Sequence, residues 1–312
     1  MIPVIYICTL LVFFAIFWIF ALGQNVMLGY GGLPMLGFMG LVAVGAYTTA
    51  ILSTQYNFPF IATLPISCLM TMLIGFAIGW LFIRGRLAGA YLVVGSIGFN
   101  YVIVAILLFA PYFGRMYGII GVPAPEILGY SFSSPLTFSI LSLFLAVVMT
   151  FLDLKLSRSV LGLGLKALRE DSTAAESSGV DTVRLKVLAF VIGSLYAGIG
   201  GCLYAYFIKS AHPFYFEFHH SVEVFLMVIL GGMGTTIGPI IGASVPTLVP
   251  EALRGHVPIE ARFLIYSILI VIVVLFEPAG ILGRGSRVRR LLSKLVTPLL
   301  SKLSRLRYAR GQ

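Results

Sequence analysis

The stretch IPVIYICTLLVFFAIFWIFAL, residues Ile2–Leu22, carries no charged side chain. An α-helix needs about 20 such apolar residues to cross the ~30 Å hydrocarbon core of a membrane. Apolar runs of comparable length recur along most of the chain, in which 59% of the residues are hydrophobic and 10% are charged. A transmembrane β-barrel would instead show segments of about ten residues with alternating polarity. The sequence therefore predicts an all-α polytopic membrane protein.

The first run is predicted to be a membrane span rather than a cleaved signal peptide. No Lys or Arg precedes it, more apolar sequence follows it, and no A-x-A-like cleavage site leads into a soluble region. About seven full spans and a pair of partial helices account for the apolar runs. The last full span is expected at Arg262–Leu282, and the N-terminus is expected outside.

Lysine and arginine residues gather at three places along the chain. Arg84 and Arg86 close one apolar run, six basic residues fall between 155 and 186, and nine lie in the tail 284–312, which has no acidic residue. Short segments rich in Lys and Arg stay on the cytoplasmic side of a membrane. We therefore expect a transmembrane domain over 1–283, with its largest cytoplasmic loop at 155–186, and a basic cytoplasmic tail over 284–312. The tail also favours contact with anionic membrane lipid, whereas the lack of interleaved aromatic residues disfavours nucleic-acid binding.

Connections of weak or balanced charge are expected on the opposite side of the membrane. They are Pro111–Ser134, Lys209–His220 and Glu251–Ala261. The histidines of the chain are His212, His219, His220 and His256. All four fall in these predicted outside loops, where a solvated or interfacial role is expected.

The segment SVEVFLMVILGGMGTTIGPIIGASVPTLVP, residues 221–250, is too short for two full spans and a loop. The span before it is expected to end on the outside, and the last span must start there in order to return to the cytoplasmic tail. The segment between them must therefore begin and end on the outside. Its centre, Gly231-Gly232-Met233-Gly234, contains three residues that disfavour helix. We therefore expect two partial helices that meet at a glycine turn. Such irregular backbone is tolerated at membrane depth where it is buried in protein or lines a wet cavity.

A second break lies in NVMLGYGGLPMLGFMGLVAVGAYTTAIL, residues 25–52. Five glycines and one proline within residues 29–40 interrupt what would otherwise be one long helix. One interpretation is a kinked, closely packed helix, since Gly and Pro are common in membrane helices. The other is a discontinuity that lines a transport pathway, for which two interrupted segments are a sequence signal. The candidate pathway-lining residues are Gly31, Gly32, Pro34, Gly37, Gly231, Gly232 and Gly234.

The usual signatures of catalysis are missing from the sequence. There is no GxxxxGK[ST] phosphate loop, no Gly-x-Ser-x-Gly elbow and no metal-ligand spacing of Cys or His. We therefore expect no enzyme activity and no cofactor on this chain, and any ATP-driven step would use a separate ATPase that holds ATP and Mg²⁺. Asp153, Glu223 and Glu277 lie near the ends of apolar runs, where a charged side chain can reach the membrane surface. This placement disfavours a proton-driven carrier, which would need ionisable groups near mid-membrane.

The stretch LREDSTAAESSGV, residues Leu168–Val180, concentrates charge in the largest predicted cytoplasmic loop. Its composition favours one or two short helices. Thr173 and Glu176 have the spacing of a capping box, and Gly179 is a natural helix terminator. Two interpretations remain open at this point: a solvated connector, or a docking element for a soluble partner.

Three blocks of sequence resemble a known family. They are ALREDSTAAESSGVDTVRLKVLAFVIGSLYAGIGGCLYA (167–205), LGYGGLPMLGFMGLVAVGAYTTAIL (28–52) and VILGGMGTTIGPIIGA (228–243). In this order they are similar to the LivM-type permease subunits of branched-chain amino acid ABC importers, over roughly Gln24–Gly283. The resemblance implies an ABC importer permease fold in the bacterial cytoplasmic (inner) membrane, with alternating access and a cytoplasmic C-terminal tail.

The resemblance also implies partners and a role for the charged loop. The partners would be a paralogous LivH-type permease, two cytoplasmic ABC ATPases and an extracytoplasmic solute-binding protein. The loop would couple the permease to an ATPase, with the alanines packing against the ATPase, Gly179 allowing the turn and the charges orienting the contact. The coupling-loop residues implied are Arg169, Glu170, Asp171, Ala174, Ala175, Glu176 and Gly179.

One departure from the family pattern bears on the transported solute. Where the family usually has Ser-Leu-Gly-His, this chain has Pro34-Met35-Leu36-Gly37-Phe38. Branched-chain or other hydrophobic amino acids are the favoured cargo. Urea, short amides or another small solute are the alternative, and a stand-alone secondary carrier or channel is less favoured.

Overall fold

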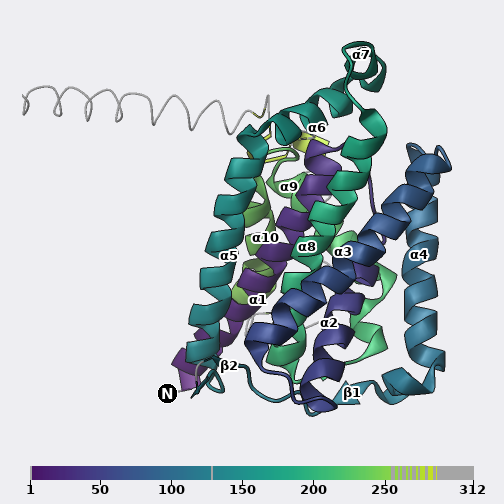
Figure 1. Cartoon of the computed structure of the whole chain (residues 1–312). Helices are drawn as coiled ribbons and strands as arrows, with labels where there is room; N and C mark the ends of the chain where they lie inside the picture. The colour runs from purple at the N-terminus through teal and green to yellow at the C-terminus, as the bar shows by residue number, and fades with distance from the viewer. Residues whose placement is uncertain are drawn as a thin grey trace, which may run out of the picture.

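The computed structural model of the chain describes residues 2–127 and 129–253, with isolated residues between 257 and 286. More than half of the predicted last span, Arg262–Leu282, and all of the tail 284–312 except Ser286 lie outside the described residues. The described part is mostly helical, as the apolar runs predict. Figure 1 shows the long helices running side by side between two ends of the molecule.

The first helix, α1 (Ile2–Gln24), continues directly into a π-helical turn, η1 (Asn25–Tyr30). An irregular segment follows over 31–37 before the next helix, α2 (Phe38–Thr54). The remaining described helices are α3 (Phe60–Arg84), α4 (Ala90–Phe109), α5 (Pro135–Arg158), α6 (Val160–Glu170), α7 (Ser172–Ser177), α8 (Thr182–Ile208), α9 (Phe218–Gly231) and α10 (Gly238–Ala252).

Short elements complete the described fold at the end of the molecule where the N-terminus lies (Figure 1). The short 3-10 helices are η2 (Pro111–Phe113), η3 (Arg115–Tyr117) and η4 (Pro213–Phe216). Strand β1 (Ile119–Ile120) pairs antiparallel with β4 (Ser210–Ala211), and β2 (Glu126–Ile127) pairs with β3 (Tyr130–Ser131). The first pairing joins the connection after α4 to the connection after α8.

Helix α8 forms the centre of the bundle. Within its most apolar window 72% of the residues are buried, against 33–44% for the other long apolar helices. Close packing around it depends on small residues, because a Cβ added at Gly79 of α3 would lie 2.7 Å from Cβ of Phe190 in α8. In a bilayer such close approach supplies packing energy between helices that the hydrophobic effect does not.

Within the described residues, six helical segments are long and apolar enough to cross a membrane. The first runs over Val4–Tyr30, which is longer than predicted because η1 extends α1. Helix α2 is shorter, with 17 residues, because the glycine-rich break removes its first turns. The prediction of a multi-spanning helical protein with an interrupted second segment is confirmed.

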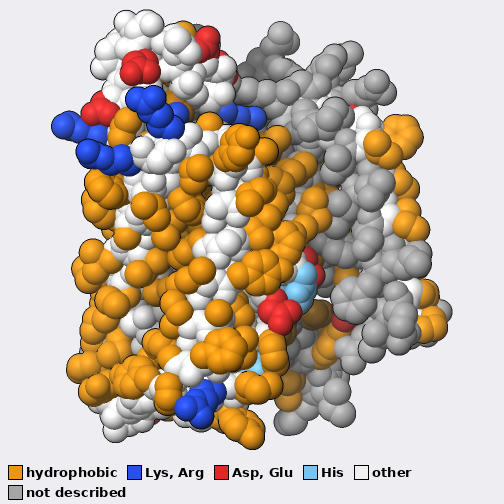
Figure 2. Space-filling model, turned by 90° about the vertical axis from the view of Figure 1, so that its right-hand side faces the viewer, with side chains coloured by type: hydrophobic (Ala, Val, Ile, Leu, Met, Phe, Trp, Pro, Cys, Tyr) orange, Lys and Arg blue, Asp and Glu red, His pale blue; other side chains and the backbone are white. Residues whose placement is uncertain are grey.

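The two ends of the bundle differ in charge as the sequence predicts. Arg84 and Arg86, at the end of α3, lie at the same end as α6 and α7 (Figure 1). Most of the Lys, Arg, Asp and Glu side chains visible on one face lie at this end (Figure 2). The predicted loop 155–186 is shorter than expected, because α5 extends to Arg158 and α8 begins at Thr182.

Helices α9 and α10 form the predicted pair of partial helices. They run antiparallel, and backbone atoms of Gly231 and Gly238 at the turn, and of Met227 and Gly242 further along, are in close contact. The turn requires glycine at two positions, since Gly232 has a φ of 117° and Gly234 a φ of 76°. The turn lies at the end of the bundle that carries α6.

The start of α9 lies at the middle depth of the bundle and not outside it. Asn100 is the eleventh of the twenty residues of α4, and its Nδ2 donates to the carbonyl of Phe216, 3.2 Å away. After β4 the chain turns inward through η4 because the ring of Phe216 is buried against Tyr47 and Tyr204.

The prediction that His219 and His220 lie in an outside loop is therefore wrong. His212 does lie at the end of the bundle opposite α6 and α7, where its Nε2 is 2.7 Å from the carbonyl of Met116 next to β1. His256 lies outside the described residues.

Candidate functional site

The charged loop folds as two short helices joined at one residue, Asp171. Its side chain caps α7, because Oδ1 accepts hydrogen bonds from the backbone N–H groups of Thr173 (2.8 Å) and Ala174 (3.0 Å). These bonds lower the pKa of the Asp171 carboxyl group, that from Ala174 most. The predicted cap at Thr173 is therefore wrong by two residues, since aspartate is the better N-cap.

The end of α7 follows the prediction made for Gly179. This residue has a φ of 83°, and its N–H donates to the carbonyl of Glu176, 2.9 Å away. The next residue, Val180, donates to the carbonyl of Ala175 (3.2 Å). A left-handed glycine followed by such a bond ends a helix.

The two alanines of the loop differ in exposure. Ala174 is exposed, whereas Ala175 is only 6% exposed and packs inside the chain. Glu170, Asp171 and Glu176 are exposed. Of the two alanine methyl groups, only that of Ala174 is presented on the surface of α7.

Arg169 is exposed overall, but its guanidinium group reaches into the bundle. Its Nη1 donates to the carbonyl of Gly29 in η1, 2.5 Å away. Gly32 and Gly234 both approach the same side chain: an added Cβ would lie 3.0 Å from Arg169 Cγ at the first and 2.7 Å from Nη1 at the second. One arginine of the charged loop thus contacts both glycine-rich breaks.

The two breaks also bind each other directly through Asn25, a residue that sequence reasoning missed. Its Nδ2 donates to the carbonyl of Thr235 (3.0 Å), and its Oδ1 accepts from the N–H of Gly234 (2.9 Å). Both backbone groups belong to the turn between α9 and α10. The available signal was the polar pair Gln24-Asn25 between two apolar runs.

A buried polar cluster lies beside this contact and joins three further elements. The hydroxyl of Tyr30 donates to Oδ2 of Asp153 in α5 (2.7 Å) and lies 3.1 Å from Oγ1 of Thr236. Nζ of Lys166 in α6 lies 4.9 Å from the centre of the Tyr30 ring and donates to the carbonyl of Ser157 (2.7 Å). Asp153 is fully buried, so the expectation that it reaches the membrane surface is wrong.

Three of the predicted pathway residues line a small cavity at this junction. The cavity has a volume of about 140 Å³ and is lined by Gly31, Gly32, Pro34, Leu168, Arg169 and Lys186, among others. By contrast, Gly37 packs against the backbone of Ser96 in α4. Gly231 and Gly232 are buried in the turn, where the carbonyl of Gly231 accepts a hydrogen bond from the N–H of Leu282 (3.0 Å).

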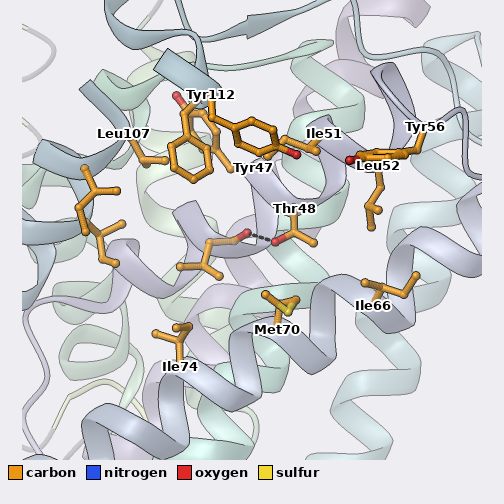
Figure 3. Close-up of a pocket in the computed structure, with 14 residues that line it drawn as sticks. Tyr47, Thr48, Ile51, Leu52, Tyr56, Ile66, Met70, Ile74, Leu107 and Tyr112 are labelled. Carbon is orange, nitrogen blue, oxygen red and sulfur yellow. Dashed lines mark hydrogen bonds between the residues drawn. The ribbon is translucent and has the colours of Figure 1, made fainter. Parts of the chain in front are cut away.

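A larger cavity, of about 530 Å³, lies between α2, α3 and α4 near the opposite end of the bundle. Figure 3 shows Tyr47, Thr48 and Tyr112 among the aliphatic side chains that line it. None of its lining residues is charged. The cavity suits an apolar group and offers no ionic partner.

The geometry thus joins a surface loop to two backbone breaks inside a helical membrane bundle. The family described as "Branched-chain amino acid transport system / permease component" matches residues 6–274 of this chain. The chain belongs to this family. The resemblance that the three sequence blocks indicate is therefore confirmed, and so is the helical permease fold.

Named relatives agree with the family. The chain is 33% identical to the high-affinity branched-chain amino acid transport permease LivM of Escherichia coli, over 86% of this chain and 68% of the relative. It is 23% identical to a probable LivM of Methanocaldococcus jannaschii, over 88% and 93%. The LivH permease of E. coli is 30% identical over 45% of each chain. No solved structure matches the chain.

Proposed function

We propose that the chain is the membrane-spanning subunit of an ATP-driven importer for branched-chain or other hydrophobic amino acids. The observation that carries the proposal is family membership over residues 6–274 together with the contact of Arg169 with both breaks. The importer acts in the bacterial cytoplasmic membrane, and α6, α7 and the C-terminal tail face the cytoplasm.

The proposed complex contains further chains. A LivH-type permease pairs with this one, and the similarity to LivH over 45% of the chain supports a paired arrangement of related folds. Two cytoplasmic ATPases bind ATP and Mg²⁺, and an extracytoplasmic protein delivers the solute. This chain itself contributes neither a cofactor site nor catalysis, and it contacts membrane lipid rather than nucleic acid.

The contacts around Arg169 give this proposal a mechanism. Helix α7 docks on an ATPase through its exposed face, including Ala174 and Glu176. When the ATPases close on ATP, α6 moves with α7, and Arg169 transmits the movement to η1 and to the turn between α9 and α10. Coupling of this kind requires contacts that differ between the outward-open and inward-open states.

The buried cluster provides a second connection for the same movement. Lys166 lies on α6 and packs on the ring of Tyr30. The hydroxyl of Tyr30 in turn contacts Asp153 and Thr236. A shift of α6 therefore acts on α5 and on the α9–α10 turn together. Because buried polar groups are costly to leave unpaired, this cluster favours two discrete arrangements over a continuous range.

A different small solute, such as urea or a short amide, is the second candidate cargo. The segment Pro34–Phe38, which replaces the usual family pattern, favours it because its first residue, Pro34, lines the small cavity at Arg169. The argument from charge against a stand-alone carrier no longer holds, since ionisable residues lie at the start of α9. Membership of the permease family is now the evidence that favours an importer subunit over a stand-alone carrier.

Transport by the reconstituted complex tests the proposal. The chain is purified with its partner subunits, placed in proteoliposomes with the solute-binding protein, and supplied with labelled leucine or urea. We expect leucine uptake that depends on ATP supplied on the side of the membrane that carries the ATPases. Uptake by this chain alone, driven by an ion gradient and indifferent to ATP, would contradict it.

A variant of α7 tests the docking contact separately. Glu176→Trp places a large ring on the exposed face of α7 and is expected to abolish uptake and substrate-stimulated ATP hydrolysis. Membrane insertion and pairing with the second permease should stay intact, because Glu176 is exposed. Normal uptake by this variant would contradict docking through α7.

A further inference from the structure

Four ionisable side chains gather at the start of α9. Glu217 is the N-cap residue of the helix, and His219, His220 and Glu223 follow in its first turns. Nδ1 of His219 lies 3.5 Å from a carboxylate oxygen of Glu217, and Nδ1 of His220 lies 3.2 Å from one of Glu223. The two imidazole rings are 3.9 Å apart between their centres. We call these four residues the mid-depth patch.

The depth of the patch follows from two contacts with α4. Asn100 binds the carbonyl of Phe216, and the ring of Tyr101 lies 6.3 Å from that of Phe218. Both α4 residues lie in the middle of a 20-residue apolar helix. The patch is therefore about equally far from the two membrane surfaces.

The patch is nevertheless exposed on this chain. The side chains of His219, Glu217, His220 and Glu223 are 59%, 41%, 34% and 33% exposed. Figure 2 shows histidine and acidic side chains together at about half the height of the molecule, apart from the charged groups at its two ends. The described surface that adjoins them is hydrophobic.

An exposed patch of this kind does not suit contact with lipid. Ionisable side chains in the bilayer centre are costly, and they face a bundle interior or a water-filled passage. A second polar group lies at the same depth: Asn100 is fully buried, and its Oδ1 has no hydrogen-bond partner among the described residues. A buried acceptor without a partner is a place where water is expected.

We propose that the mid-depth patch lines the aqueous pathway of the importer and binds the zwitterionic head group of the amino acid in transit. The carboxylates of Glu217 and Glu223 bind the ammonium group. With a proton on both ring nitrogens, the imidazoles of His219 and His220 donate through Nδ1 to these two glutamates and through Nε2 to the carboxylate of the solute. The patch holds donors and acceptors a few ångströms apart, as the two charges of an amino acid require. This inference rests on the proposed amino-acid import.

Water access is tested by cysteine labelling in the assembled complex. His219→Cys is made in a chain whose own Cys8, Cys68 and Cys202 are replaced by serine, and is treated with a charged methanethiosulfonate reagent. The matched control is Val147→Cys, since Val147 is 56% exposed near the middle of α5, on an apolar surface. We expect His219→Cys to react at least about 100-fold faster, and leucine to slow its reaction, because only a hydrated thiol ionises to the reactive thiolate. Equal, slow labelling of both positions would overturn the proposal.

Head-group recognition is tested by uptake. The double variant Glu217→Gln and Glu223→Gln keeps shape and removes charge, and it should lower ATP-driven leucine uptake by about 10- to 100-fold, the effect of losing hydrogen bonds to a charged group. Basal ATP hydrolysis and subunit assembly should persist. Unchanged leucine uptake in the double variant overturns the inference alone, whereas absence of ATP-driven leucine uptake in the unmodified complex overturns the proposed function. If the double variant does not assemble, the labelling experiment decides.

Discussion

The two helices of the charged loop adjoin in sequence but differ in what they touch. Helix α6 ends in Arg169, whose guanidinium reaches the backbone of η1 and the turn between α9 and α10. Helix α7 exposes Ala174 and Glu176, and a Cβ added at its terminal Gly179 would meet no atom within 4 Å. One helix therefore belongs to the bundle, and the other is a surface element.

This difference separates two roles that the sequence presents as one stretch. Changes in and around α6 should alter the stability of the permease itself, because they disturb packed backbone. Changes in α7 should leave the bundle intact and affect only the contact with a partner. The predictions below test this division, ordered by their expected effect on stability.

The largest effect is expected where the two breaks touch. A Cβ at Gly29 would lie 2.6 Å from the backbone N of Gly234. Gly29→Ala should therefore destabilise the protein by about 1–3 kcal/mol, the usual cost of overpacking, and lower the thermal unfolding midpoint in detergent. The matched control is Gly98→Ala in α4, where an added Cβ meets nothing within 4 Å. That variant should be neutral or slightly stabilised, and equal losses in both would contradict the packed junction.

A smaller effect is expected from removing the arginine at this junction. Arg169→Ala deletes the hydrogen bond to Gly29 and should cost about 1.5 kcal/mol, as for other hydrogen bonds to charged groups. It should also lower uptake more than ATP hydrolysis. The control, Arg184→Ala, removes a side chain that is 84% exposed and forms an ion pair with Asp181 on the surface. If the two variants lose uptake equally, Arg169 has no special part in coupling.

A backbone effect is expected at Gly179. Alanine there must adopt a φ of 83°, which costs about 1–2 kcal/mol locally. The strain should appear as faster amide exchange at the end of α7, without a change in the unfolding midpoint of the bundle. Gly121→Ala is the control, since Gly121 has a φ of 85° and also has free space, but lies at the opposite end. Only Gly179→Ala should reduce substrate-stimulated ATP hydrolysis.

The smallest effect is expected from the cap of α7. Hydrogen bonds from Ala174 and Thr173 lower the pKa of Asp171 in the folded state, so its carboxylate stabilises α7 above the unfolded pKa of about 3.9. This contribution is lost as pH falls through the lowered folded-state pKa. Amide exchange in α7, corrected for its intrinsic pH dependence, should lose protection below about pH 4. Asp171→Ala should show the unprotected level of amide exchange at every pH. If that variant still lost protection below about pH 4 as the unmodified chain does, capping by Asp171 would be contradicted.

Much of the candidate site was accessible from sequence, but its internal contacts were not. The charged stretch, the terminator at Gly179 and the glycine turn all depend on local chemistry, and they are found where predicted. Asn25 and Tyr30 were missed, and Asp153 was wrongly placed at the membrane surface, because each is explained only by a partner more than 100 residues away. The cap at Asp171 was missed because Asp171 and Thr173 can each cap a helix, and only the backbone geometry distinguishes them.

The sequence alone determined that this chain is a helical membrane protein, which end carries its charge, and where its helices break. Those properties follow from hydropathy, from the positive-inside bias and from the conformational freedom of glycine, all of which act locally. Tertiary structure decided that the two breaks meet at Arg169 and that α9 begins at mid-depth. These placements depend on which buried surfaces pack together, above all the rings around Phe216 and the small residues facing α8, and no local pattern encodes them.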